Sequence, residues 1–307
     1  MNLKSGISEI IGIKAEDKKT SIKYRIIESI REVGYERQLI EYNSDGDTVV
    51  AFLLIPEVLG NNPAVLINHQ HNSERHLGKS EVCGLAGNPL QAFGPELARK
   101  GFAVLAPDSI CFEDRRKNAE GILPLPGNED FFQHLNEMCY RILNGDNLMK
   151  KVLLDAMNGV TLLSEMTFTD SERIGALGHS YGGNTVLFLS ALDERISFSC
   201  ASGSACTYEN RMMNDVGIEL ASVIPGFCRS YDIGDLVKCI APRPLLIASA
   251  DEDKYSKDAD FIIDKARPTY VEYGAENELC HMRYHGGHEL TKERFDDIIE
   301  WIGKRAD

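Results

Sequence analysis

The stretch Gly178-His179-Ser180-Tyr181-Gly182-Gly183 stands between an apolar run, Arg173-Ile174-Gly175-Ala176-Leu177, and a segment with helical spacing. A serine between glycines where a strand ends is typical of a nucleophile elbow, a sharp strand-to-helix turn that exposes the hydroxyl. Such a turn holds its serine in sparsely populated backbone space. The strand also packs so closely on the helix that a side chain at Gly178 or Gly182 would not fit. We therefore interpret Ser180 as a candidate nucleophile; the alternative is a glycine-rich turn with an idle serine.

Carboxylates follow this serine in the loop after a second apolar run. In proteins with such an elbow, the acid and then the histidine come after the serine along the chain. The run at 245–248 predicts a buried strand, and Asp251, Glu252 and Asp253 come directly after it. We predict Asp253 as the acid and keep Asp251 as the reserve. Glu252 is the least favoured of the three.

Histidines downstream of these carboxylates supply the candidate base. His281 falls inside a predicted strand, whereas His288 follows two glycines at the start of the last helix, on a loop free to approach Ser180. We predict His288 as the base and keep His285 as the less favoured alternative. In this arrangement His288 accepts the Ser180 proton during attack, and Asp253 fixes its tautomer and stabilises the imidazolium.

A second group of candidates would stabilise an oxyanion. The backbone N–H of Tyr181, the residue after the nucleophile, is the first predicted donor. The second should come from the loop 68–73, which follows the predicted strand at 64–67. We assign it to the N–H of His71, with Gln70 as the reserve.

Three histidines in and after this loop raise the alternative of a metal site. His69, His71 and His76 include an H-x-H spacing that is compatible with metal ligation. No aspartate or further histidine follows at the spacing of a binuclear hydrolytic site. We therefore expect no metal and no cofactor, a buried hydrogen-bonding role for His69, and a position in the pocket wall for the His71 side chain.

The rest of the chain alternates strands and helices after an opening hairpin. This alternation favours a mostly parallel α/β sheet with helices on both faces, whose strand C-termini and following loops share one edge. Strands are predicted at 36–42, 48–55, 63–68, 102–106, 173–177, 196–201, 244–248 and 279–284. Helices are predicted over about 5–34, 95–100, 132–166, the segment after 181, 258–273 and 289–304.

The N-terminal segment and two insertions lie outside this alternation. Isoleucines with helical spacing predict a helical extension over residues 1–34, namely Ile22, Ile26, Ile27 and Ile30. This extension could cover the sheet edge or form a homo-oligomer contact. Residues 35–307 would then form the catalytic domain. Within it, 109–131 and 203–238 both leave the end of a strand and are expected to line a pocket.

Composition and charge restrict the classes of partner. The 307 residues carry a net charge of −14, which disfavours nucleic acid and anionic membranes as partners. The N-terminus lacks the pattern of a signal peptide, and the apolar runs are shorter than the ~18 residues of a membrane helix. We therefore expect a cytoplasmic protein. Eight cysteines without a C-x-x-C pair indicate free thiols.

With these motifs in place, the chain resembles the α/β-hydrolase superfamily from about residue 36 to its end. Within that superfamily it is similar to the dienelactone hydrolase-like and acetyl xylan esterase-like branch. The closer match is carried by Asn68-His69-Gln70-His71-Asn72, His76-Leu77-Gly78-Lys79-Ser80-Glu81, Ala106-Pro107-Asp108 with Glu113-Asp114-Arg115-Arg116, the elbow, Ala241-Pro242-Arg243-Pro244-Leu245-Leu246-Ile247, and Gly286-Gly287-His288-Glu289.

The resemblance implies the α/β-hydrolase fold, with a twisted sheet of about eight strands, and hydrolysis of carboxylic esters. It places Ser180, Asp253 and His288 at the triad positions. Dienelactone hydrolases proper use a cysteine where this chain has Ser180, which disfavours dienelactone opening. The usual His-Gly of the oxyanion loop is His69-Gln70 here. Cys111 and Phe112 replace the glycine-containing turn that relatives often have.

The predicted pocket walls suggest the substrate. Beside His71 and Tyr181, they are Phe112, Arg115, Arg116, Phe227 and Tyr231. This mixed apolar and polar set favours small or medium acyl esters, including acetyl groups on sugars or a lactone. For Arg115 and Arg116, surface ion pairs are an equal alternative. Two rival functions remain: a serine peptidase or amidase on the same fold, and a non-catalytic binding protein.

Overall fold

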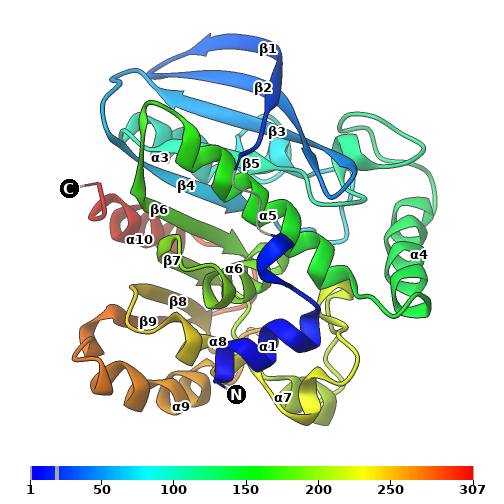
Figure 1. Ribbon diagram of the computed structural model, residues 1–307, viewed down its shortest axis with the longest axis vertical. Helices are drawn as coiled ribbons and strands as arrows, with labels where there is room; N and C mark the ends of the chain where they lie inside the picture. Colours follow the sequence, from blue (N-terminus) through cyan, green and yellow to red (C-terminus); the bar gives the residue numbers. More distant parts are fainter. Residues whose placement is uncertain (1, 18–20, 307) are drawn as a thin grey trace.

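A nine-stranded sheet runs through the computed structural model, which describes residues 2–17 and 21–306 (Figure 1). Its strand order is β1-β2-β3-β5-β4-β6-β7-β8-β9. The pairs β1–β2, β2–β3 and β3–β5 are antiparallel, and all pairs from β5 through β4 to β9 are parallel. The strands are β1 (Tyr24–Glu32), β2 (Tyr35–Ser44), β3 (Asp47–Pro56), β4 (Asn62–Asn68), β5 (Ala103–Pro107), β6 (Thr169–His179), β7 (Ile196–Ser202), β8 (Leu245–Ala250) and β9 (Leu279–Tyr284).

Helices cover both faces of this sheet. Apolar side chains of α1, α5, α6, α8 and α9 join one buried core, and those of α3 and α10 join the core on the opposite face. The helices are α1 (Leu3–Ile11), α2 (Lys79–Val82), α3 (Phe93–Arg99), α4 (Glu129–Leu143), α5 (Leu148–Glu165), α6 (Tyr181–Leu192), α7 (Tyr208–Met213), α8 (Ile233–Ile240), α9 (Ala259–Glu272) and α10 (Lys292–Gly303). The central strands β5 and β8 are buried along their whole length, as expected for parallel strands covered on both sides.

The predicted helical extension is wrong over most of its length. Only Leu3–Ile11 forms an α-helix, whereas Tyr24–Glu32 forms β1, which pairs with β2 and adds a ninth strand to the predicted eight. The register shifts between Ile26 and Glu28. This bulge interrupts the two-residue alternation of a strand, so the isoleucines mimic helical spacing. Residues 18–20 of the predicted helix lie outside the described residues.

The helix predicted over 132–166 is two helices. α4 ends at Leu143 and α5 begins at Leu148, with Gly145 at a φ of 74° between them. The side chain of Asn147 accepts a hydrogen bond from the backbone N–H of Lys150 and caps α5. The break separates α4 from the body of the sheet, and Figure 1 shows α4 standing to one side of it.

The loops that carry the candidate residues lie at the C-terminal ends of the parallel strands. The two predicted insertions also start from this edge: 109–131 follows β5 and leads to α4, and 203–238 follows β7 and contains α7. All eight cysteines are free thiols, as predicted. No helix among the described residues is long and apolar enough to cross a membrane.

Candidate active site

The turn between β6 and α6 has the geometry of a nucleophile elbow. Ser180 has φ 55° and ψ −117°, outside the regions that residues with a side chain commonly occupy. A Cβ atom on Gly178 would lie 2.3 Å from the carbonyl carbon of Gly182, and one on Gly182 would lie 1.9 Å from the carbonyl oxygen of Asn68. The expected absence of room at these two glycines is therefore confirmed.

Ser180, His288 and Asp253 form one hydrogen-bonded chain. Ser180 Oγ lies 2.8 Å from His288 Nε2, and His288 Nδ1 lies 3.0 Å from Asp253 Oδ1. The carboxylate also accepts hydrogen bonds from Ser256 Oγ at 2.7 Å and from the backbone N–H of Tyr255 at 2.9 Å. Burial alone would raise the pKa of Asp253, but His288 and these donors outweigh it and hold the pKa below its usual value. Because an ionised carboxylate only accepts hydrogen bonds, His288 carries its proton on Nδ1 and offers Nε2 to the serine hydroxyl.

The two reserve residues pair with each other. Asp251 Oδ2 lies 3.0 Å from His285 Nδ1, and Asp251 Oδ1 accepts the backbone N–H of Gly286 at 2.9 Å. The bond from His285, with that from Gly286, lowers the pKa of Asp251 to about 2. Asp251 raises the pKa of His285 in return. This pair is exposed, and neither of its members contacts Ser180 in the described structure.

The imidazole of His288 packs between two rings. His179 lies on one side with ring centroids 5.0 Å apart, and Tyr255 meets it edge-on at 4.8 Å. His179 is buried and bonds Ser202 Oγ at 2.9 Å. Its burial, and then the neighbouring His288, hold the pKa of His179 well below its usual value. A neutral ring therefore supports His288 without repelling it when it becomes charged.

The two residues predicted to supply the oxyanion donors line the same cavity as the serine. Tyr181 is the first residue of α6, so its N–H has no partner within the helix. Among the described residues, neither this N–H nor that of His71 has a hydrogen-bond acceptor. Both residues line the cavity beside Ser180 and His288.

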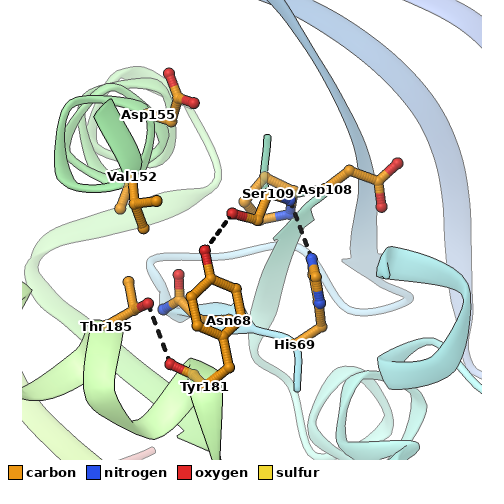
Figure 2. Close-up of a pocket in the computed structure, with 10 residues that line it drawn as sticks. Asn68, His69, Asp108, Ser109, Val152, Asp155, Tyr181 and Thr185 are labelled. Carbon is orange, nitrogen blue, oxygen red and sulfur yellow. Dashed lines mark hydrogen bonds between the residues drawn. The ribbon is translucent and has the colours of Figure 1, made fainter. Parts of the chain in front are cut away.

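The Tyr181 side chain and His69 fasten the loops behind these donors (Figure 2). Figure 2 shows both rings directed toward Ser109. The Tyr181 hydroxyl lies 2.5 Å from Ser109 Oγ, and the Ser109 N–H donates to His69 Nε2 at 3.0 Å. His69 Nδ1 then donates to the carbonyl of Gln70 at 2.7 Å. Burial lowers the pKa of His69 to about 4, so the ring stays neutral. The predicted structural role of His69 is confirmed.

A cavity of about 290 Å³ opens beside Ser180. Its wall contains His71, as predicted, and Tyr181. Sequence reasoning missed most of the others, which come from the loop after β4, from α4, from α6, from the 203–238 insertion and from the loop after β8. These additional residues include Arg75, Phe131, Asn184, Arg211, Ile218, Glu219, Leu220 and Tyr255. The signal that could have found Arg75 was its position shortly after the loop 68–73, which was assigned to the oxyanion.

The loop after β5 does not contribute the three predicted wall residues. Phe112 is fully buried and stacks on the Tyr181 ring at 5.5 Å. The Arg115 side chain is buried in ion pairs with Asp47 and Asp155. Cys111 and Glu113 adopt positive φ values of 67° and 38°, which turn the loop inward.

Arg116, the third of these residues, and the remaining two predicted wall residues, Phe227 and Tyr231, also pack elsewhere. The Arg116 guanidinium pairs with Asp130 at 2.8 Å and donates to three backbone carbonyls. Phe227 is buried against Phe188 in the core. Tyr231 packs on Phe227 at 5.8 Å. None of the three is part of the cavity wall at Ser180.

Carboxylates cluster at one place that the metal hypothesis did not consider. Among the described residues, Asp108, Glu113 and Asp114 are the side chains close enough together to share an ion. The Lys79 ammonium lies among them, 2.8 Å from Asp108 and 2.5 Å from each of the other two. His69 and His71 make the hydrogen bonds and ion pair of the pocket loops instead.

Two sequence comparisons relate the chain to a protein family and to one bacterial protein. A sequence model of the "Prolyl oligopeptidase family" matches residues 141–221. The Bacillus subtilis protein "Putative hydrolase YtaP" is 24% identical over 96% of this chain and 96% of its own length.

Solved structures share the fold at lower identity. A "putative acetyl xylan esterase" from Bacteroides fragilis is 17% identical over 92% of this chain and 73% of its own, with a TM-score of 0.74. A glucuronoyl esterase from Solibacter usitatus is 13% identical over 99% of this chain and 92% of its own, with a TM-score of 0.71. The predicted fold class is confirmed: this chain has the α/β-hydrolase fold, in the form also found in these esterases.

Proposed function

We propose that the protein is a serine hydrolase that cleaves carboxylic esters, with Ser180 as nucleophile, His288 as base and Asp253 as the supporting acid. The observation that carries the proposal is the continuous hydrogen-bonded chain from Ser180 through His288 to the buried Asp253, at a strained elbow beside a cavity. A serine hydroxyl needs such a base to become nucleophilic.

The first half-reaction forms an acyl-enzyme. Ser180 Oγ attacks the ester carbonyl carbon while its proton moves to His288 Nε2. The carbonyl oxygen becomes an oxyanion that accepts hydrogen bonds from the N–H groups of Tyr181 and His71, and each such donor contributes about 3 kcal/mol to the transition state. As the intermediate collapses, His288 gives its proton to the leaving alkoxide, and Asp253 stabilises the transient imidazolium.

Water completes the second half-reaction along the same path. His288 takes a proton from the water as it attacks the acyl carbon, and then returns a proton to Ser180 Oγ. The products are the carboxylic acid and the regenerated serine. No metal or cofactor is needed for any of these steps.

Cavity size and the structural neighbours favour a small or medium acyl ester. The cavity of about 290 Å³ lies at the lower end of pockets for small molecules, which span about 300–1,000 Å³. Acetyl xylan and glucuronoyl esterases share the fold over nearly the whole chain. Acetylated sugars and short esters are therefore the proposed substrate class.

A peptidase is the second candidate, because the matching family model is that of the prolyl oligopeptidases. The same triad can cleave an amide, although an amine leaves less readily than an alkoxide. Comparing 4-nitroanilides of proline-containing peptides with 4-nitrophenyl acetate separates the two. The peptidase would be favoured if the enzyme accelerates hydrolysis of the anilides, relative to their uncatalysed rates, more than it accelerates hydrolysis of the ester.

The decisive variant is Ser180→Ala. We expect kcat/KM for 4-nitrophenyl acetate to fall about 10⁴- to 10⁶-fold, because the nucleophile is removed. Ser230→Ala, which alters an exposed serine of the 203–238 insertion, is the matched control and should retain full activity. Circular dichroism verifies that both variants fold. Substantial esterase activity in folded Ser180→Ala would contradict the assignment.

A further inference from the structure

The cavity beside Ser180 contains more positive than negative side chains. Arg75 and Arg211 both line it, although their residues are only 5% and 6% exposed. Neither guanidinium has an ion pair within the described part of the chain. Glu219 is the carboxylate of the cavity wall, and its direct partner is His71. Two permanent cations therefore stand against one anion in a protein whose net charge is −14.

Arg75 is the less satisfied of the two arginines. Its Nε donates to His134 Nδ1 at 3.0 Å, and its guanidinium lies over the rings of Phe131 at 5.2 Å and Phe112 at 5.8 Å. Its two terminal nitrogens have no hydrogen-bond acceptor among the residues that the structure describes. A buried guanidinium without an anion is unfavourable, because burial removes hydration that no acceptor replaces at the two terminal nitrogens.

Other charges around Arg75 do not supply this anion. Burial lowers the pKa of the guanidinium, and Glu219 opposes that effect from nearby. The Glu219 carboxylate is bound to His71, which with neighbouring His134 and Arg75 holds its pKa at about 2 against the effect of burial. Glu219 is bound to His71 through Oε2, its buried Oε1 has no hydrogen-bond partner among the described residues, and it makes no ion pair with Arg75, whose terminal nitrogens also have no acceptor there.

Arg211 extends the positive wall toward the triad. Its Nη1 donates to the carbonyl of Gly217 at 2.9 Å, and its guanidinium lies 5.6 Å from the centre of the Tyr255 ring. Tyr255 in turn packs edge-on against His288. The loop after β4 and the 203–238 insertion thus each place one arginine in the wall of the same cavity.

We propose that the ester substrate carries a carboxylate, which Arg75 binds through its terminal nitrogens while Arg211 adds to the positive potential of the cavity. This inference rests on the proposed esterase function and narrows its substrate class to anionic esters. The planar guanidinium matches a carboxylate with two parallel hydrogen bonds, and such charge-assisted pairs are strong in a site removed from water.

Matched ester pairs test this inference on either side of the scissile bond. For the acyl side, mono(4-nitrophenyl) adipate is compared with 4-nitrophenyl hexanoate; for the alcohol side, 4-acetoxybenzoate is compared with 4-acetoxybenzamide. We expect the wild type to prefer the anionic member of at least one pair. In Arg75→Gln the anionic-to-neutral ratio of kcat/KM should fall about 10- to 100-fold, the effect of one charge-assisted hydrogen-bonded pair. Arg75→Lys should lie in between.

The control is Arg229→Gln, which removes one positive charge from an exposed position of the 203–238 insertion, the segment that also carries Arg211. Its ratio should equal that of the wild type. Equal or higher turnover of both neutral esters by the wild type would overturn the inference but leave the esterase proposal intact. An unchanged ratio in Arg75→Gln would overturn the role of Arg75.

A binding measurement tests the anion site independently of the esterase proposal. Adipate and adipamide are titrated calorimetrically into the wild-type protein, which requires neither turnover nor a stable variant. Tighter binding of adipate, weakened by Arg75→Gln where that variant folds, supports the anion site even if no ester is cleaved. Equal affinity for the acid and the amide would contradict it.

Discussion

Two aspartate–histidine pairs connect the same two loops of this protein, and they differ in almost everything except distance. Asp253–His288 and Asp251–His285 both join the loop after β8 to the loop after β9, each with an O–N separation of 3.0 Å. The side chains of the first pair are 0% and 26% exposed, and those of the second are 47% and 85% exposed. The pair in contact with Ser180 is the buried one.

An aspartate–histidine contact alone therefore does not identify a candidate catalytic pair. Burial of the aspartate and contact of the histidine with Ser180 distinguish the first pair from the surface pair. An exposed ion pair contributes about 0–1 kcal/mol, because water screens it and both side chains lose freedom. Asp253 is instead held by Ser256 and Tyr255 as well as by His288. These bonds orient its carboxylate before any substrate binds.

The largest expected contrast is between the two histidines. Removing the base in His288→Ala should lower kcat/KM for 4-nitrophenyl acetate about 10⁴- to 10⁶-fold, since the serine then has no proton acceptor. His285→Ala should stay within about twofold of the wild type, because a surface pair contributes little. Steady-state kinetics on both variants, at equal folded concentration, measure the contrast. Comparable losses in the two variants would remove the distinction between the pairs.

A smaller contrast is expected between the two aspartates. Asp253→Asn should lower kcat about 10²- to 10⁴-fold, because an amide can no longer fix the His288 tautomer or stabilise its charged form. Asp251→Asn should leave kcat nearly unchanged, since its partner does not reach Ser180. The same ester assay checks both. Loss of activity in Asp251→Asn alone would mean that the acid had been assigned to the wrong carboxylate.

The smallest effect concerns the titration of His285. Asp251 raises the pKa of His285 through a hydrogen bond and its charge. The stabilising contribution of a histidine with a raised pKa is complete below the pKa of the unfolded chain, and it is lost as pH rises through the folded pKa. In Asp251→Asn the pKa of His285 should therefore fall toward about 6.5, the value of a free histidine. A histidine NMR titration measures this. An unchanged pKa would show that the pair does not form in solution.

The elbow was predictable because its constraints are local. Gly178 and Gly182 have no space for a Cβ, so the two glycines in the sequence directly indicate that backbone packs against backbone at this turn. The position of Asp253 was harder, because Asp251 lies on the same loop and also meets a histidine. Sequence spacing favoured Asp253, but the burial that separates the two belongs to the folded loop.

The pocket walls could not be predicted in the same way. Phe112 and Arg115 have side chains that suit a pocket, yet the loop after β5 turns them into the core and into ion pairs. The path of the 203–238 insertion brings Arg211 and Glu219 to the cavity, and no local pattern in the sequence encodes that path. Side-chain chemistry alone does not indicate the direction in which an irregular loop faces.

The misassigned strand β1 illustrates a different limit. It lies at the edge of the sheet, and eight of its nine residues are exposed, so no buried face imposes an alternation on its sequence. Together with the bulge, this exposure removes the period of two by which strands are recognised. The pairing with β2 that fixes its structure is formed with residues outside its own segment.

The contacts of Tyr181 connect the elbow to the loop after β5, which lies outside the wall of the cavity at Ser180. Tyr181 lines the cavity, while its ring stacks on Phe112 and its hydroxyl meets Ser109. A displacement of the loop after β5 would therefore shift the first turn of α6 and, with it, the position of Ser180. Substitutions at Ser109 and Phe112 would therefore change the position of Ser180 without changing any residue of the cavity wall.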